Sequence, residues 1–312
     1  MSSKTAAVGV GAVLVFCLAM SAGGARAEDL TVVNPRAAYP EGPLVAFGAV
    51  YYAEMGADRV MRWDGEASVP VWSRDGCLPT SVARGAGETL LVLCHREGAI
   101  VRVTKQGETI AVIDRDARGN RFVNPNASVN DGRGGVYLSA SGDFAPGAPA
   151  RGAVLYLDPS GRLSRVAEGI RYANGVALTP DGMSLYVSEH LARRVLAYDV
   201  AADGSLSGAR VFLHLDDAVG VDPARGWEVG PDGLAVDRHG NVYIAEYGGG
   251  RIVVVDRDGK PLATIDVPER YTTAAALIND ERRLIITAPV SLFDPGAFGK
   301  VYVVDNPVYR ED

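Results

Sequence analysis

The chain has 312 residues, of which 37 are glycine, 17 are proline and three are cysteine, and its formal net charge at pH 7 is −7. An acidic balance of this size argues against nucleic acid and anionic membranes as partners, because both attract basic surfaces. It is compatible with a cationic ligand.

The first 27 residues have the pattern of a secretory signal peptide. Lys4 gives a positive start, an apolar run extends from Ala6 to Met20, and Ala25-Arg26-Ala27 has the A-x-A form of a cleavage site. The run is short for a membrane span, and a retained anchor is the alternative. We predict a cleaved signal peptide over 1–27, a mature domain over 28–312, and export to the periplasm or the medium without membrane attachment.

Short apolar runs rich in Val, Ile, Leu and Tyr alternate with Gly, Asp, Asn and Pro turns through the rest of the chain, which is typical of an all-β protein. One pattern recurs six times: a strand, a tight polar turn and a second strand. The six copies are residues 40–54, 79–94, 125–140, 173–189, 231–246 and 273–288.

The residues that lead these copies are 39 to 58 positions apart. This spacing is close to the roughly 40–45 residues of a four-stranded propeller blade, and the intervening residues supply the other two strands. The repeat therefore predicts an all-β fold, a six-bladed β-propeller in one domain.

The last copy has a third strand, KVYVVD at 300–305, and the chain then ends without a fourth. The strand DLTVV at 29–33 is left without a blade. We predict that this N-terminal strand completes the last blade and closes the ring, because closure removes the exposed sheet edges at the seam.

Cys77 and Cys94 are the two cysteines outside the predicted signal peptide. A hairpin turning at residues 85–87 would bring them nearly opposite each other. Since export places them in an oxidising compartment, we predict a Cys77–Cys94 disulfide. The alternative is a pair of buried thiols.

The leading residues of the six copies should form a ring around the axis, because the innermost strands of a propeller line its central channel. Every one of them carries a side-chain oxygen. They are Glu41, Thr80, Asn126, Asn174, Asp232 and Thr273.

Two carboxylates converging on one axis resist ionisation unless a cation neutralises them. Oxygen ligands favour a hard divalent ion, Ca²⁺ above all, with Mg²⁺ and then Zn²⁺ as lesser options. A single Asn-Gly or Asp-Gly is more often a turn former, but the recurrence in register favours a metal site. The predicted metal ligands are Glu41, Asn126, Asn174 and Asp232. We expect Gly175 to let the backbone turn tightly enough to aim Asn174 inward.

A second register lies at the ends of the second strands. Its members are Glu54, Cys94, Ala140, Glu189, Glu246 and Ala288. Antiparallel pairing returns these ends to the same face, so Glu189 and Glu246 are candidates for substrate binding. The alternative is that such carboxylates accept backbone N–H bonds from the following loop.

The histidines divide into two pairs by their places in the repeat. His95 and His190 follow the second register, and we expect both to face the pocket, His95 as a substrate-binding residue. His214 and His239 are expected at the rim and at the opposite face.

Four segments resemble the SMP-30/gluconolactonase/luciferin-regenerating-enzyme family. They are PEGP at Glu41, NRFVNPN at Asn126, ANGVALTPDGMSLYVSE at Asn174 and GPDGLAVDRHGNVYIAE at Asp232. The resemblance implies a six-bladed propeller with an axial divalent cation, commonly Ca²⁺, and hydrolysis of lactones. Glu41, Asn174 and Asp232 match the family's metal ligands, and Asn126 matches the Asn that completes the metal shell or holds substrate.

The chain departs from the family's pattern at two places. Family members that act on sugar lactones often carry Arg where Asn124 stands, and often an aromatic residue where Leu44-Val45 follows PEGP. The resemblance therefore extends to the metal site but not to specificity for aldonolactones.

The hypothesis that follows is metal-assisted hydrolysis of a small-molecule lactone or ester by a monomer. Asp232 activates water or attacks directly, and Asn126 orients the substrate oxygen. Two rivals stay open: a non-catalytic binding propeller with a structural ion, and a strictosidine-synthase-like propeller with Glu246 or Glu269 as base.

Overall fold

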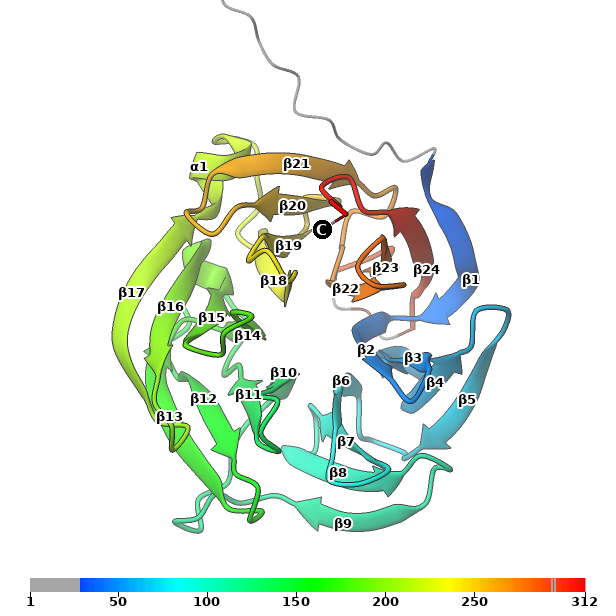
Figure 1. Ribbon diagram of the computed structural model, residues 1–312, viewed down its shortest axis with the longest axis vertical. Coiled ribbons are helices and arrows are strands. Elements are labelled where there is room, and N and C mark those ends of the chain that lie inside the picture. The colour runs from blue at the N-terminus through cyan, green and yellow to red at the C-terminus, as the bar shows by residue number, and fades with distance from the viewer. Residues whose placement is uncertain (1–28, 293, 295, 312) are drawn as a thin grey trace, which may run out of the picture.

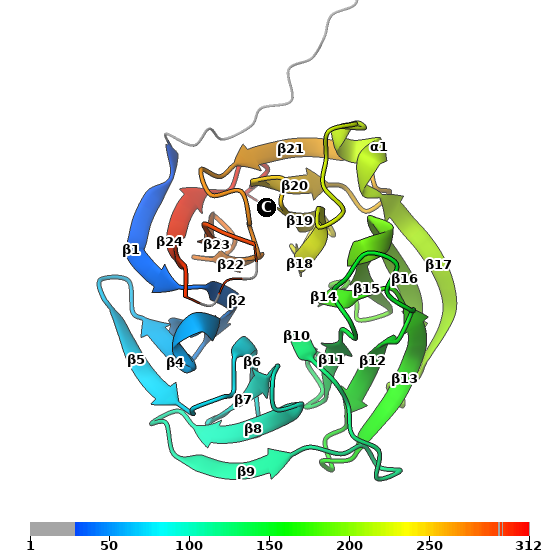
Figure 2. The ribbon, with the colours of Figure 1, turned by 180° about the vertical axis from the view of Figure 1, so that it is seen from behind.

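In the computed structural model, which describes residues 29–292, 294 and 296–311, the chain forms six four-stranded antiparallel sheets arranged around a central axis (Figures 1 and 2). The predicted six-bladed β-propeller is confirmed. The predicted signal peptide, residues 1–27, lies outside the described residues. Within the described ranges no helix is long and apolar enough to cross a membrane.

The first three blades each run outward from the axis in chain order. Blade 1 consists of β2 (Pro40–Ala46), β3 (Ala49–Glu54), β4 (Arg59–Trp63) and β5 (Ser68–Ser73). Blade 2 consists of β6 (Pro79–Arg84), β7 (Thr89–Cys94), β8 (Ala99–Thr104) and β9 (Thr109–Ile113). Blade 3 consists of β10 (Pro125–Asn130), β11 (Val136–Ala140), β12 (Gly152–Leu157) and β13 (Leu163–Ile170).

The next two blades follow the same order, and the last one differs in its outer strand. Blade 4 consists of β14 (Ala173–Leu178), β15 (Ser184–Glu189), β16 (Arg194–Val200) and β17 (Leu206–His214). Blade 5 consists of β18 (Gly230–Val236), β19 (Val242–Tyr247), β20 (Arg251–Val255) and β21 (Pro261–Asp266). Blade 6 consists of β22 (Ala274–Ile278), β23 (Arg283–Pro289), β24 (Phe298–Asp305) and β1 (Thr31–Ala38). Short helices, η2 (Met55–Ala57), η3 (His190–Ala192) and α1 (Leu215–Val219), lie in the connections.

The hydrophobic core lies between the faces of neighbouring blades. The second strand of a blade is covered on both faces, so β3 and β7 read as nearly continuous apolar runs and are buried almost throughout. One buried cluster joins Tyr51 and Trp72 of blade 1 to Val92 and Val101 of blade 2. Each sheet thus buries its two faces against different neighbours, and a blade depends on the blades beside it.

The N-terminal strand closes the ring as predicted. β1 pairs with β24, with Thr31 opposite Val303 and Ala38 opposite Phe298, so it is the outer strand of the last blade. Figure 1 shows β1 in blue alongside β24 in red. The strand extends beyond the predicted 29–33, up to Ala38, and the chain then passes directly to β2 at the axis.

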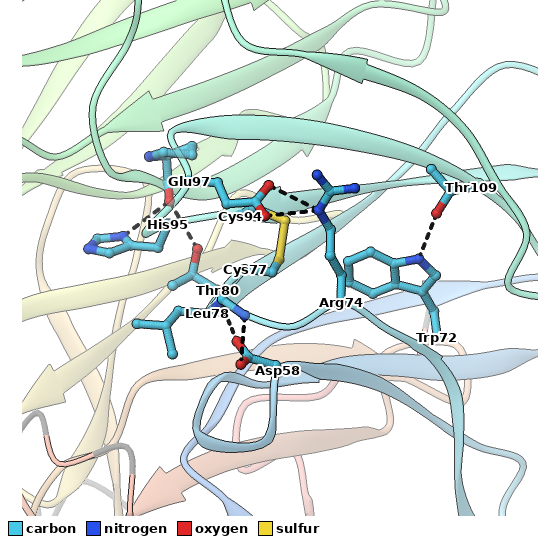
Figure 3. Close-up of a disulfide and its surroundings, with 12 residues drawn as sticks. Asp58, Trp72, Arg74, Cys77, Leu78, Thr80, Cys94, His95, Glu97 and Thr109 are labelled. Carbon is cyan, nitrogen blue, oxygen red and sulfur yellow. Dashed lines mark hydrogen bonds and ion pairs between the residues drawn. A yellow bond between two sulfur atoms is a disulfide. The ribbon is translucent and has the colours of Figure 1, made fainter.

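The predicted disulfide is confirmed. Cys77 and Cys94 are bonded with their Cα atoms 4.5 Å apart, and both are fully buried. The bond joins the segment entering β6 to the end of β7 (Figure 3). The Asp58 carboxylate accepts hydrogen bonds from the backbone N–H groups of Gly76 (3.0 Å) and Leu78 (2.7 Å), which fixes this entry against blade 1.

Shortening the chain at its N-terminus tests the closure. A chain that begins at Asn34 loses the pairing of Thr31 and Val32 with β24 and exposes part of that strand's edge. We expect the melting temperature to fall by about 5 °C or more, as a loss of about 2 kcal/mol would give in a domain of this size. A chain that begins at Leu30 keeps β1 and is the control; equal melting of the two chains would contradict the closure.

Removing the disulfide should destabilise the whole domain. The Cys77→Ala/Cys94→Ala double variant is expected to lose about 3 kcal/mol of unfolding free energy, the typical effect of closing a loop of this length. Urea denaturation measures the loss. Mass spectrometry of the unreduced wild type should give a mass lower than that of the reduced chain by two hydrogen atoms. A reductant should shift the wild-type transition and leave the variant unchanged. If the wild-type unfolding transition stayed unchanged after the denatured chain had been equilibrated with reductant, this would count against the bond.

Candidate functional site

A pocket opens on the axis at the end of the ring where the innermost strands begin. It brings together all four predicted metal ligands, together with His95 and His190. The described residues that line it are Tyr39, Glu41, Met55, Thr80, His95, Asn126, Phe144, Tyr172, Asn174, His190, Asp232 and Tyr247.

Three positions of the repeat supply nearly all of this lining. The leading residue of the innermost strand contributes in five blades, while Thr273 of the sixth is buried and bonded to the Pro40 carbonyl. The residue two positions earlier contributes Tyr39 and Tyr172. The residue just after the second register contributes Met55, His95, His190 and Tyr247. Only Phe144 comes from a long connection.

The position two before the leading residue has an unusual backbone. Tyr39, Leu78, Asn124 and Tyr172 all have φ between 46° and 63°, the left-handed region that side chains rarely adopt. The four carbonyls accept N–H bonds from Met55, His95, Ser141 and His190 at 2.9–3.2 Å. Each bond ties the start of the innermost strand to the end of the second strand of the same blade and holds the strained turn. In the pairs Tyr39–Met55 and Tyr172–His190 both residues line the pocket.

The second register does not reach the pocket. Glu189 and Glu246 are buried, and each pairs with the Arg five positions later, Glu189 with Arg194 at 2.6 Å and Glu246 with Arg251. Glu189 also accepts the Arg171 N–H at 2.9 Å, so it bonds to a backbone amide as the alternative expected, but in the connection before β14 and not in the loop that follows it. Successive strand residues point to opposite sides, so the residue that follows each Glu faces the pocket and the Glu itself faces the blade interface. The geometry gives no support to substrate binding by Glu189 or Glu246.

The floor of the pocket holds two carboxylates close together. Asp232 is 6% exposed. Glu41 is half-buried: it lines the pocket, and protein atoms surround its carboxylate. Burial and the neighbouring charge of Asp232 raise the pKa of Glu41 well above its usual range, and burial raises the pKa of Asp232 likewise. Without a compensating charge the pair resists full ionisation.

Asn174 adds a third polar side chain to this pair. Its side-chain amide donates to Asp232, while its buried Oδ1 has no hydrogen-bond partner. A buried oxygen without a partner is rare and costly in a folded protein. An oxygen of this kind beside two carboxylates fits a hard cation.

The candidate ligands are two carboxylates and two side-chain amides, a set without histidine or cysteine. In the part of the chain that the structure describes, no three His, Cys, Asp or Glu side chains gather as a metal-binding group. A cation here would therefore be held by Glu41 and Asp232 together with the amide oxygens of Asn174 and Asn126. Such all-oxygen sets suit Ca²⁺ better than Zn²⁺.

Gly175 serves the site differently from the expected tight turn. Its backbone is not left-handed, but a Cβ on it would lie 2.2 Å from the carbonyl oxygen of Asp232. Ser188 Oγ donates to that same carbonyl at 2.7 Å. Gly175 is thus required because the innermost strands of blades 4 and 5 touch at the level of the two ligands.

His95 and His190 both face the pocket, as expected. Burial lowers the pKa of each to about 4, so both are neutral near pH 7. His95 Nδ1 lies 3.2 Å from the Pro125 carbonyl and His190 Nε2 lies 2.8 Å from the Glu228 carbonyl. A carbonyl only accepts, so these nitrogens carry the ring protons. Figure 3 shows His95 and Thr80 at this wall, beside the disulfide.

The other two histidines lie away from the pocket. His214 ends the outer strand β17 and is exposed, as expected. His239 lies in the turn between β18 and β19 at the opposite end of the blade, where it is half-buried. Neither contributes to the site.

The aromatic residues of the wall were missed by the sequence analysis. Tyr39, Tyr172 and Tyr247 occupy repeat positions, so the register argument would have found them had it been extended by two residues before and one after. Burial raises the pKa of Tyr39 and of Tyr172, so both phenols keep their protons. Phe144 carried no periodic signal.

The two buried histidines predict a pH dependence of stability. Their ordinary pKa is near 6.5, so between about pH 6.5 and 4 the unfolded chain binds protons that the folded protein does not. Stability therefore falls as the pH falls through this window. His190→Gln should reduce the loss of unfolding free energy between pH 7 and 5 by about 2 kcal/mol, measured by urea denaturation. The exposed His214→Gln is the control, and equal slopes for H190Q and wild type would contradict the assignment.

Comparison with known proteins places this geometry in a family. Residues 39–289 match the SMP-30/Gluconolactonase/LRE-like region. The pentonolactonase XacC of Haloferax volcanii is 28% identical over 233 residues, which are 73% of this chain and 72% of that protein.

Two solved structures share the fold. A gluconolactonase from Xanthomonas campestris is 24% identical with a TM-score of 0.70, covering 89% of each chain. A calcium-binding protein, regucalcin, from Agrobacterium tumefaciens is 19% identical with a TM-score of 0.72, covering 90% of this chain and 94% of the other. The resemblance drawn from the four segments is confirmed: the chain belongs to the SMP-30/gluconolactonase/LRE-like family.

Proposed function

We propose that this protein is an exported lactonase that depends on a divalent cation, Ca²⁺ first among the options. The observation that carries the proposal is the convergence of Glu41, Asp232 and the unpartnered Oδ1 of Asn174 on one enclosed floor. The kinship with a pentonolactonase supports the reaction, and the kinship in fold with a calcium-binding regucalcin supports the cation.

The cation would be held by the four predicted ligands, which are Glu41, Asn126, Asn174 and Asp232. Bound there, it would act as a Lewis acid towards the lactone carbonyl and neutralise the two carboxylates. Asn126, 8% exposed on the wall, is placed to donate from its amide to a substrate oxygen and so to orient the ring.

Asp232 is the proposed base. As the water oxygen bonds to the carbonyl carbon, the Asp232 carboxylate takes up a proton from that water. The carbonyl carbon–ring oxygen bond then breaks, and the proton passes to the leaving ring oxygen. The product is the open hydroxy acid. Tyr172 and His190 pack around the floor and limit the access of bulk water.

Export rests on two features of the chain. The N-terminal 27 residues have the n-region, apolar run and cleavage motif of a signal peptide. The Cys77–Cys94 disulfide is of the kind that persists in oxidising compartments. We propose a periplasmic or secreted protein.

Neither Glu246 nor Glu269, the bases considered for a strictosidine-synthase-like propeller, is available to a substrate in the pocket. Glu246 pairs with Arg251, as described above. Glu269 accepts from the Tyr302 hydroxyl (2.5 Å) and pairs with Lys300 (2.9 Å). Neither carboxylate lines the pocket.

Asp232→Asn tests the proposal, because it keeps much of the ligand geometry and removes the base. We expect kcat for lactones to fall at least 100-fold, within the usual effect of removing a positioned base. Aliphatic, aromatic and sugar lactones and a phosphotriester should be assayed with Ca²⁺ and after chelation, while the melting temperature is followed.

Asp199→Asn, which removes a carboxylate from an exposed pair with Arg210, is the control and should behave as wild type. Undiminished turnover in D232N would refute the base. A melting temperature raised by Ca²⁺ without hydrolysis of any ester would favour a non-catalytic propeller instead.

A further inference from the structure

The upper wall of the pocket is aromatic. Phe144, from the connection between β11 and β12, lies with its ring centroid 4.8 Å from that of Tyr172 and 5.0 Å from that of Trp227. It also meets His190 at 5.3 Å and Tyr247 at 6.3 Å in edge-on contacts. One ring thus contacts side chains from blades 4 and 5 and from the connection before β18. Phe144, Tyr172, His190 and Tyr247 line the pocket and form its aromatic rim, and Trp227 packs against Phe144 from behind this lining.

Several polar groups of this wall are already bonded within the protein, although the buried Nδ1 of His190 has no hydrogen-bond partner. The hydroxyls of Tyr39 and Tyr247 bond to each other at 2.8 Å. Thr80 Oγ1 donates to the Pro125 carbonyl at 3.1 Å, and His190 Nε2 is bonded to the Glu228 carbonyl. A ring bearing several hydroxyls would have to break some of these bonds or bury most of its hydroxyls without partners, and both are unfavourable.

The charge of the pocket also excludes classes of substrate. None of the lining residues that the structure describes is lysine or arginine, whereas Glu41 and Asp232 lie at the floor. An anionic substituent would find no positive side chain on this wall. The wall is therefore complementary to an uncharged substituent.

Asn124 holds the aromatic rim in place. Its side-chain amide donates to the Gly142 carbonyl at 2.8 Å, and its own carbonyl accepts from Ser141 N–H at 2.9 Å. Ser141 Oγ in turn donates to the Ala173 carbonyl at 2.7 Å. The side chain at this position therefore anchors the connection that carries Phe144, and Asn124 is a positioning residue for the rim.

We propose that the site selects lactones or esters that carry an uncharged, apolar, planar substituent, and that Phe144, supported by Trp227, determines this selectivity. The proposal rests on the proposed lactonase function for its kinetic test, but the binding of the substituent does not depend on it. Polyhydroxylated sugar lactones are the poorer substrates, because the rim offers their several hydroxyls few partners.

Three six-membered lactones with alkoxide leaving groups give a matched kinetic series: δ-valerolactone, its benzo-fused relative isochroman-3-one, and glucono-1,5-lactone. With Ca²⁺ present and rates divided by those of hydroxide hydrolysis, kcat/KM should be about tenfold or more higher for isochroman-3-one than for δ-valerolactone, and lowest for the sugar lactone. Phe144→Ala and Trp227→Ala should each lower kcat/KM for isochroman-3-one about tenfold, and by more than for δ-valerolactone.

Phe298→Ala is the control for these variants. Phe298 is 42% exposed, against 45% for Trp227, and it packs on Arg36 at the outer strands of blade 6. Its variant should keep the wild-type order of the three lactones. A glucono-1,5-lactone rate equal to or above that of isochroman-3-one would overturn the proposal, as would equal losses for the two apolar lactones in F144A.

A binding measurement separates this inference from the reaction. The lactam analogue of isochroman-3-one is not hydrolysed and can be titrated by calorimetry in the presence of a chelator. It should bind the wild type about tenfold more tightly than F144A and more tightly than δ-valerolactam. If it does so while no lactone is hydrolysed, the proposed reaction fails and the selectivity of the pocket stands. Equal affinity of the wild type and F144A for the lactam would overturn the selectivity, whatever the kinetics show.

Discussion

Two carboxylates enclosed by protein at one end of the propeller axis are the constraint on which the site depends. Glu41 and Asp232 come from blades 1 and 5, and burial together with their mutual repulsion opposes their ionisation. No single blade can create this arrangement, because it requires six innermost strands to converge. The unpartnered oxygen of Asn174 belongs to the same arrangement, and a divalent cation would satisfy all three groups at once.

The rest of the fold keeps these groups together in one pocket. The strands of blades 4 and 5 approach so closely that Gly175 has no room for a side chain. Thr80 and Thr273 use their hydroxyls to bond carbonyls of the next blade in the ring. The strand β1 closes the circle, and without closure the sixth blade would have no outer strand against which β24 could pair. The precision of the floor therefore depends on contacts between blades more than on those within any blade.

The walls and the floor have different chemical characters. The floor is acidic and rich in amide oxygens, whereas the rim is formed by aromatic rings, and the hydroxyls of Tyr39 and Tyr247 beside them are bonded to each other. Left-handed residues such as Tyr39 and Tyr172 aim side chains at the pocket at a cost of about 1–3 kcal/mol each, which the repeated backbone bonds offset. This division gives the carbonyl end of a substrate a polar, charged environment and its substituent an apolar one.

Much of the fold and of the candidate site could be predicted from the sequence repeat. The spacing of the six copies predicted the blades, the strand left over at the N-terminus predicted the closure, and the oxygen side chains in register predicted Glu41, Asn126, Asn174 and Asp232 as a group. These predictions succeeded because a propeller converts equal sequence positions into equal places around an axis. The disulfide followed from hairpin register for the same reason.

Only the tertiary structure decided which side of each strand faces the pocket. Glu189 and Glu246 lie one residue from His190 and Tyr247, yet strand alternation sends the carboxylates into ion pairs at the blade interface and the rings into the pocket. The sequence shows which positions are equivalent between blades. It does not show which side chains at the strand ends face the pocket, because the backbone leaves regular geometry there. Phe144, which lines the pocket, packs against Trp227 from a connection 83 positions away, and no periodicity links the two residues. The sequence by itself thus determined the fold and the floor, because both repeat; the rim required the folded chain, because connections do not.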